Sequence, residues 1–259
     1  MFETIFAHIY KQYKKNVKNP SDLSWILLYP LTGLLSLGIF GLFIQSGTDM
    51  NPLNFIIVGV IVWNAYAISQ KAVTYGLSYD VWDECLRHSF LGKSTDEDSI
   101  LGNSLFGLVT SIIAILILAA VTQLLFGFNI LVAGIPLVIG LLSVFMFAVS
   151  IGLLINSLVL TKGHEWMSLI WMTTGMIMII SGVYYPVEIL PSPVRELSYL
   201  FPPTHSITAI RGAVGIVETN INLELVYSII LSTIFLVLSI LYYKKSVRKA
   251  REIGSLLWF

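Results

Sequence analysis

Six long runs of apolar residues dominate the sequence, and none carries an Asp, Glu, Lys or Arg near its centre. A helix that crosses a bilayer needs about 20 such residues, because the hydrocarbon core is about 30 Å thick. We therefore predict an all-α polytopic membrane protein with six transmembrane helices. The predicted spans are residues 25–44, 55–73, 105–126, 131–157, 167–183 and 225–243.

The composition supports this fold class and excludes several functions. Hydrophobic residues make up 56% of the 259 positions and charged residues 12%, whereas about a quarter of the residues of an average soluble domain are charged. The 15 basic and 15 acidic residues cancel, so no basic excess indicates nucleic acid as a partner. The single cysteine, Cys85, excludes a disulfide framework and a cysteine-based zinc site.

The basic residues indicate how the chain is oriented. Residues 1–20 fit an amphipathic helix that lies on the inner membrane surface, with apolar side chains at helical spacing and four lysines on the opposite arc. Lys and Arg are enriched in cytoplasmic segments, and 13 of the 15 basic residues fall on one side of the predicted spans. We therefore expect a single permease domain, residues 1–259, in the plasma membrane, with a cytoplasmic N-terminus and a cytoplasmic tail over residues 244–259.

The loop between the second and third spans is long and polar, and its first part suits a helix with one apolar side. A helix over residues 79–88 would place Val81, Trp82, Cys85 and Leu86 on one side, away from Asp80 and Asp83. Such a stripe docks into a groove on a partner protein. The alternative is a short surface helix that packs against the protein's own spans.

The segment between the fifth and sixth spans, residues 184–217, carries five of the nine prolines and is still apolar and aromatic. It is too interrupted to span a bilayer, and irregular backbone at membrane depth needs protein or water around its polar groups. We expect two short helices, near residues 192–201 and 204–214, that dip into the outer leaflet.

Motifs for catalysis, cofactors and metals are missing from the sequence. Gly92-Lys93-Ser94 lacks the earlier glycine of a phosphate-binding loop, and His164-Glu165 lacks the second histidine of a zinc-protease helix. The central polar residues of the spans are neutral, and three of them are candidates to line a pathway or to bond between helices: Asn64, Thr173 and Thr174. An intramembrane enzyme that acts on lipid and an ion-coupled carrier are the alternative functions, but both usually need ionisable groups at the midplane.

The stretch before the last span carries a family resemblance. Residues 181–191 read SGVYYPVEILP, residues 200–206 read LFPPTHS and residues 209–212 read AIRG. Their order and spacing are similar to the small-Gly-aromatic-Tyr-Pro, Leu-Pro, Pro-x-Thr-His and hydrophobic-Arg pattern of one permease family. With its six spans, interfacial helix and polar loop, the chain resembles the membrane subunit of ABC exporters of the type-2 permease class.

This resemblance implies a transport subunit rather than an enzyme. It implies a permease dimer, homodimeric or closely heterodimeric, that rests on two copies of a separate ATPase, which binds ATP and Mg²⁺. The cargo would be a hydrophobic or amphiphilic molecule, drug-like, lipid or lipid-linked glycan, and the first and fifth spans would line its route. The residues that would contact the ATPase are Tyr79, Asp80, Val81, Trp82, Asp83, Cys85 and Leu86, with a second contact at Lys162, His164 and Glu165.

The outer segment is a candidate gate, because its few charges lie in apolar surroundings. An unpaired charge there costs several kcal/mol, so we expect Glu188 to pair with Arg195 or Arg211. The hairpin then either seals the outer mouth or only anchors the segment. The gate residues are Tyr184, Tyr185, Pro186, Glu188, Pro191, Pro202, Pro203, His205 and Arg211. Tryptophans near the spans, such as Trp63 and Trp171, are interpreted as interface anchors.

Overall fold

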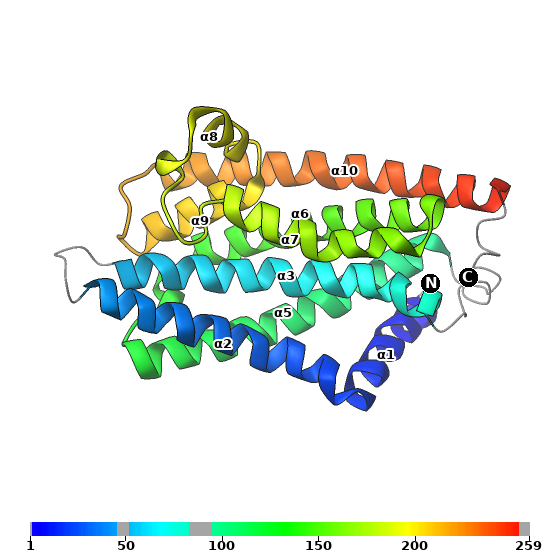
Figure 1. Ribbon diagram of the computed structural model, residues 1–259, viewed down its shortest axis with the longest axis horizontal. Coiled ribbons are helices and arrows are strands. Elements are labelled where there is room, and N and C mark those ends of the chain that lie inside the picture. Colours follow the sequence, from blue (N-terminus) through cyan, green and yellow to red (C-terminus); the bar gives the residue numbers. More distant parts are fainter. Residues whose placement is uncertain (1, 46–51, 83–94, 254–259) are drawn as a thin grey trace.

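The computed structural model of the protein describes residues 2–45, 52–82 and 95–253, and within these ranges it is helical with no strand (Figure 1). The predicted all-helical class is therefore confirmed. Three 3₁₀ helices are η1 (Ile130–Ala133), η2 (His164–Ser168) and η3 (Val187–Ile189). The α-helices are α1 (Phe2–Lys18), α2 (Pro20–Gln45), α3 (Pro52–Trp82), α5 (Asp96–Phe126), α6 (Ile135–Lys162), α7 (Leu169–Ile180), α8 (Ser192–Ser198), α9 (Pro202–Ala213) and α10 (Ile221–Ile253).

Five of these helices are long and apolar enough to cross a membrane, and they coincide with the first four predicted spans and the last. The crossing stretches are Leu28–Gln45, Pro52–Ser78, Glu97–Phe126, Ile135–Lys162 and Ile221–Ile253. The last of these extends beyond the predicted limit at residue 243, and α10, with 33 residues, is about 50 Å long. Part of the predicted tail is thus helical, and Lys244 there contacts Glu97 at 2.6 Å.

The fifth predicted span, residues 167–183, is not one continuous helix. Its α-helix, α7, has 12 residues and rises only about 18 Å. The five residues of η2 precede it, and Gly163, between α6 and η2, has a φ of 107°. Because L-residues rarely adopt that φ, the glycine lets the chain turn sharply out of α6. The run is therefore a 3₁₀ helix followed by a short α-helix.

Helix α3 forms the centre of the fold: 83% of its membrane stretch is buried. Figure 1 shows α2 and α5 on one side of α3, and α6 and α7 on the other. The ring of Tyr66 stacks on Trp63, with centroids 4.8 Å apart, and on Phe147 of α6 at 5.8 Å. A Cβ at Gly152 of α6 would lie 2.9 Å from Val73 Cβ. Close packing of this kind, through small residues, holds helices together in lipid.

Helix α1 lies at an angle to the bundle and is fixed to it by polar contacts (Figure 1). The Gln12 amide is buried and donates to the carbonyl oxygen of Ala72 at 2.9 Å and to Asn103 Oδ1 at 3.0 Å. The Lys11 ammonium pairs with the Asp80 carboxylate at 2.7 Å. On the face of α1 that is turned away from the bundle, large side chains are exposed, among them Phe2 and Phe6. The helix therefore packs through one face and presents apolar groups on another.

Two short helices, α8 and α9, stand where the sequence predicts them. Helix α9 begins at Pro202, two residues before the predicted start, because prolines fit the first turn of a helix, where no N–H is needed. It is almost entirely buried. Buried serine hydroxyls link α9 to α10 and α10 to α6: Ser206 of α9 contacts Ser228 of α10 at 2.6 Å, and Ser143 of α6 contacts Ser232 of α10 at 2.7 Å.

Candidate functional site: a cavity between α2, α3 and α7

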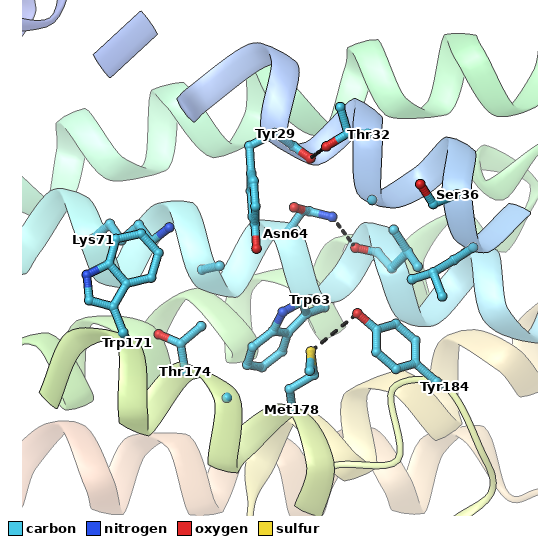
Figure 2. Close-up of a pocket in the computed structure, with 15 residues that line it drawn as sticks. Tyr29, Thr32, Ser36, Trp63, Asn64, Lys71, Trp171, Thr174, Met178 and Tyr184 are labelled. Atoms are coloured by element: carbon cyan, nitrogen blue, oxygen red, sulfur yellow. Dashed lines mark hydrogen bonds between the residues drawn. The ribbon is translucent and has the colours of Figure 1, made fainter. Parts of the chain in front are cut away.

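A cavity of about 400 Å³ lies between α2, α3 and the short helix α7 (Figure 2). Each helix contributes positions that recur at three and four residues, which is the spacing of one helical face. The lining consists of Tyr29, Thr32, Gly33, Ser36 and Leu37 of α2; Val60, Trp63, Asn64, Ala67 and Lys71 of α3; Trp171, Thr174, Gly175 and Met178 of α7; and Tyr184.

Two of the three residues that the sequence predicts to line a pathway are found in the cavity wall. Asn64 and Thr174 line the cavity, whereas Thr173 does not. The Asn64 amide donates to the carbonyl oxygen of Val60 at 2.8 Å. The buried amide of Gln70 donates to Thr173 Oγ1 at 3.1 Å and accepts from Thr174 Oγ1 at 2.7 Å. Gln70 thus joins α3 to α7 and fixes one wall of the cavity.

Aromatic rings contact Lys71, the one charged residue among the described residues of the lining. The Lys71 ammonium lies 4.1 Å from the centroid of the Trp171 ring and 5.3 Å from that of Tyr29. Ring faces attract cations at such distances. Figure 2 places Lys71 and Trp171 together at one end of the cavity and Tyr184 at the other.

One tryptophan of the cavity, Trp63, corrects the sequence interpretation, whereas the interpretation of Trp171 as an interface anchor stays a prediction. Trp63 is 7% exposed and stacks on Tyr66, so it is not an anchor at the membrane surface. Trp171 lies against Lys71 in the cavity wall. The helical spacing of Trp171, Thr174 and Met178 could have indicated a shared face, but the partner helix could not be read from it.

Of the predicted gate residues, Tyr184 lines this cavity, and Tyr185 and Pro186 follow it in the chain. The Tyr184 hydroxyl donates to Met178 Sδ at 3.2 Å, and the Tyr185 hydroxyl donates to the carbonyl oxygen of Ile179 at 2.7 Å. Burial raises the pKa of Tyr184, so its phenol is neutral at physiological pH. Pro186 and Pro191 flank the 3₁₀ helix η3.

Arg211 is buried and bonds to backbone carbonyls, which corrects one prediction. Among the described residues, neither Glu188 nor any other carboxylate pairs with it. Its Nη1 donates to Gly182 O at 2.9 Å, and its Nη2 donates to Val183 O at 2.7 Å and to Phe55 O at 3.0 Å. The carbonyls of Gly182 and Val183 are available because α7 ends at residue 180. The guanidinium therefore ties α9, the end of α7 and the start of α3 together.

A glycine makes room for this junction. A Cβ at Gly59 of α3 would collide with the carbonyl oxygen of Val183, so only glycine admits the carbonyl that Arg211 binds. The Arg211 guanidinium also stacks over the Phe55 ring, 3.4 Å from its centroid.

His205 joins the hairpin to α10. Its Nδ1 lies 2.6 Å from Glu224 Oε2 and its Nε2 lies 2.8 Å from Tyr199 O. Both neighbours are acceptors, so both ring nitrogens donate only when the imidazole is protonated. Burial alone would lower the pKa of His205, but the bonds to Glu224 and Tyr199 outweigh it and raise the pKa.

Comparison with known families identifies this architecture. The family model described as ABC-2 type transporter matches residues 3–214. The chain belongs to the ABC-2 type transporter family. No curated protein matches the chain. The predicted resemblance to type-2 permeases is thus confirmed, and the protein is the membrane component of an ABC transporter.

In this ABC-2 subunit, the predicted coupling residues lie in two groups at one end of the bundle, as far as the described residues show. Residues 79–82 form the last turn of α3, where Asp80 is 8% exposed and pairs with Lys11. Lys162 ends α6, and the exposed His164 and Glu165 follow in η2. Asp83, Cys85 and Leu86 lie outside the described residues.

Proposed function

We propose that the protein is the transmembrane subunit of an ATP-driven exporter whose cargo passes through the cavity between α2, α3 and α7. The observation that carries this proposal is the cavity itself. Its volume of about 400 Å³ falls in the range of sites for drug-sized ligands, and four aromatic side chains line it. The cargo is accordingly a hydrophobic or amphiphilic molecule, such as a drug-like compound, a lipid or a lipid-linked glycan.

In this proposal the chain crosses the plasma membrane six times, with both termini in the cytoplasm. The fifth crossing along the chain is made by η2 and α7 together. Five residues of 3₁₀ helix and 12 of α-helix rise about 28 Å in total, which approaches the thickness of the hydrocarbon core. The hairpin of α8 and α9 is then on the outer side, where it re-enters the membrane as a gate.

The energy source in this proposal is a separate ABC ATPase, present in two copies, which binds ATP and Mg²⁺. It would contact residues 79–86, which begin in the last turn of α3, and the exposed group of Lys162, His164 and Glu165. Because Asp80 pairs with Lys11, a movement of the end of α3 would also move α1. A second copy of the chain would pack against α2 and α7, whose outer faces carry exposed large side chains such as Phe43 and Met172.

The test uses the chain co-expressed with an ABC ATPase and reconstituted into proteoliposomes that contain a fluorescent NBD-labelled phospholipid. ATP should move the probe between leaflets, as measured by its protection from dithionite. Gly175→Leu should block this movement, because a Cβ at Gly175 meets no atom within 4 Å and the larger side chain fills the cavity.

The matched control is Val237→Leu, which changes an exposed residue of α10, away from the cavity and from the proposed contact between the two copies, and should transport like wild type. Transport by Gly175→Leu at the wild-type rate would overturn the cavity as the cargo route. Failure of the chain to co-purify with any ABC ATPase would overturn the exporter itself.

A further inference from the structure

Helix α9 connects α10 to the wall of the cavity. Toward the C-terminal end of α9, Arg211 binds the carbonyl oxygen of Val183, directly before Tyr184, which lines the cavity. In the first half of α9, His205 reaches Glu224 in the first turn of α10. A displacement of α9 relative to α10 therefore moves the cavity wall at Tyr184.

His205 lies between two acceptors that belong to different elements. Its Nδ1 lies 2.6 Å from Glu224 Oε2, and its Nε2 lies 2.8 Å from the carbonyl oxygen of Tyr199, the residue directly after α8. The protonated imidazole donates to both acceptors, whereas the neutral ring has one donor. Because His205 is only 8% exposed, little water can replace the lost donor. Loss of the proton thus breaks one of the two bonds that join the end of α8 to α10.

The groups around His205 make it the proton-sensitive part of this contact. Burial lowers the pKa of His205, but the bonds to Glu224 and Tyr199 raise it by more. The rings of Tyr199 and Tyr227 lie 6.3 Å and 5.5 Å from the imidazole, centroid to centroid, and phenols titrate only near about pH 10. Helix η1, which also packs on α9, carries no titratable residue. The charged residues of α3 and α6 lie in the second half of each helix, away from the hairpin: Lys71, Asp80 and Lys162.

We propose that protonation of His205 from the outer side holds the hairpin of α8 and α9 against α10 and thereby slows export, so that the external pH regulates the transporter. The contact between the Ser206 and Ser228 hydroxyls, at 2.6 Å, does not titrate. Loss of the His205 proton therefore loosens the hairpin without detaching α9 from α10. This proposal rests on the proposed function, because it assigns a regulator to the gate past which the cargo leaves.

The first experiment measures the hairpin alone and needs neither ATP nor a partner. In a Cys85→Ser background, nitroxide spin labels are attached at Ser192→Cys on α8 and Val226→Cys on α10, both exposed positions. Electron paramagnetic resonance gives the distribution of distances between the labels in the purified chain. The distribution should be narrow at about pH 6 and broader at about pH 8.5, because histidine titrates in this range whereas carboxylates and phenols do not.

The second experiment measures transport in proteoliposomes that contain the chain, an ABC ATPase and NBD-labelled phosphatidylcholine. Added ATP energises only the molecules whose ATPase faces outward, so their hairpins face the lumen. The external pH is held constant while the lumenal pH is varied. Raising the lumenal pH from about 6 to about 8.5 should speed the movement of the probe about tenfold, as expected when a hydrogen bond to a charged group is lost.

Substitutions assign the response to this contact. His205→Gln should make both the distance distribution and the transport rate independent of pH, because an amide does not titrate in this range. Glu224→Gln removes a charge that raises the pKa of His205, so it should shift the midpoint of the response to lower pH. Glu218→Gln is the matched control, because it makes the same change at an exposed carboxylate in the loop before α10. It should respond like wild type.

The outcomes separate this proposal from the proposed function. The proposal is overturned if the labels give the same distribution at both pH values, or if wild-type transport stays constant or slows as the lumenal pH rises. A pH response that survives in a monodisperse His205→Gln protein overturns the role of His205. If the distances respond to pH but no ABC ATPase drives transport by the wild type, the pH-dependent contact stands and the exporter of the proposed function fails.

Discussion

Arg211 and His205 hold the outer hairpin in place through interactions of different kinds. Arg211 is 4% exposed and satisfies carbonyls that a shortened α7 leaves open. His205 bonds to one carbonyl and one carboxylate. Only the planar guanidinium group of arginine has enough donors in the right geometry to bind three carbonyl oxygens at once. The hydrogen bonds of a histidine ring, in contrast, depend on its protonation state.

Arg211→Lys should destabilise the protein although it keeps the charge. A lysine ammonium cannot reach the carbonyls of Phe55, Gly182 and Val183 together, and each buried acceptor left without a donor costs about 1–3 kcal/mol. We expect a lower melting temperature by intrinsic fluorescence in detergent. Arg195→Lys, on α8, is the control and should melt like wild type; equal melting of Arg211→Lys would contradict the anchoring role.

The His205 contact should depend on pH. Its folded-state pKa is raised, so the contact contributes its full stability below the ordinary histidine pKa of about 6.5. The contribution is lost as the pH rises through the raised value. We expect the melting temperatures of wild type and His205→Gln to differ most at acidic pH and to converge at alkaline pH. A difference that grows with pH would show that neutral histidine makes the contact.

At the scale of the elements, the buried amide of Gln12 helps to hold α1 against the bundle. Replacing Gln12 with Leu leaves Asn103 Oδ1 and the carbonyl oxygen of Ala72 without this donor, at a cost of about 1–3 kcal/mol. Hydrogen–deuterium exchange should speed up over residues 2–18 and stay unchanged in α6. Lys18→Ala, an exposed change on the same helix, is the control and should exchange like wild type.

The elements that the sequence predicts correctly are those whose signal is local. Long apolar runs define α2, α3, α5, α6 and α10. Helix α1 ends at Lys18, directly before Asn19 and Pro20, because the residue before a proline disfavours helical backbone. The break between α6 and η2 depends instead on Gly163, and residues 182 and 183 after α7 are held by Arg211 of the hairpin. Likewise the cavity requires three helices in one rotational arrangement, so the interpretation of Trp63 as a surface anchor was wrong. Arg211 belongs to the family motif, but the carbonyl groups that it binds lie far from it in the sequence and could not be predicted.

At the scale of the whole molecule, α1 and the C-terminal turns of α10 lie at the same end of the bundle, and α8 and α9 at the other (Figure 1). The end with α1 also holds most of the basic residues, including Lys244 and Arg248. Basic segments stay in the cytoplasm. The charge distribution therefore favours the cytoplasmic side for the end with α1, and this orientation stays a prediction.

Whether η2 and α7 together cross the membrane decides the topology, and cysteines on either side of them test it. In a Cys85→Ser background, Glu165→Cys lies just before α7 and Ser192→Cys just after it, and both positions are exposed. Because η2 and α7 rise about 28 Å, we expect an impermeant maleimide to label Ser192→Cys in intact cells and Glu165→Cys only in inside-out vesicles. Labelling of both from the same side would mean that α7 turns back within the membrane, and the chain would then cross five times.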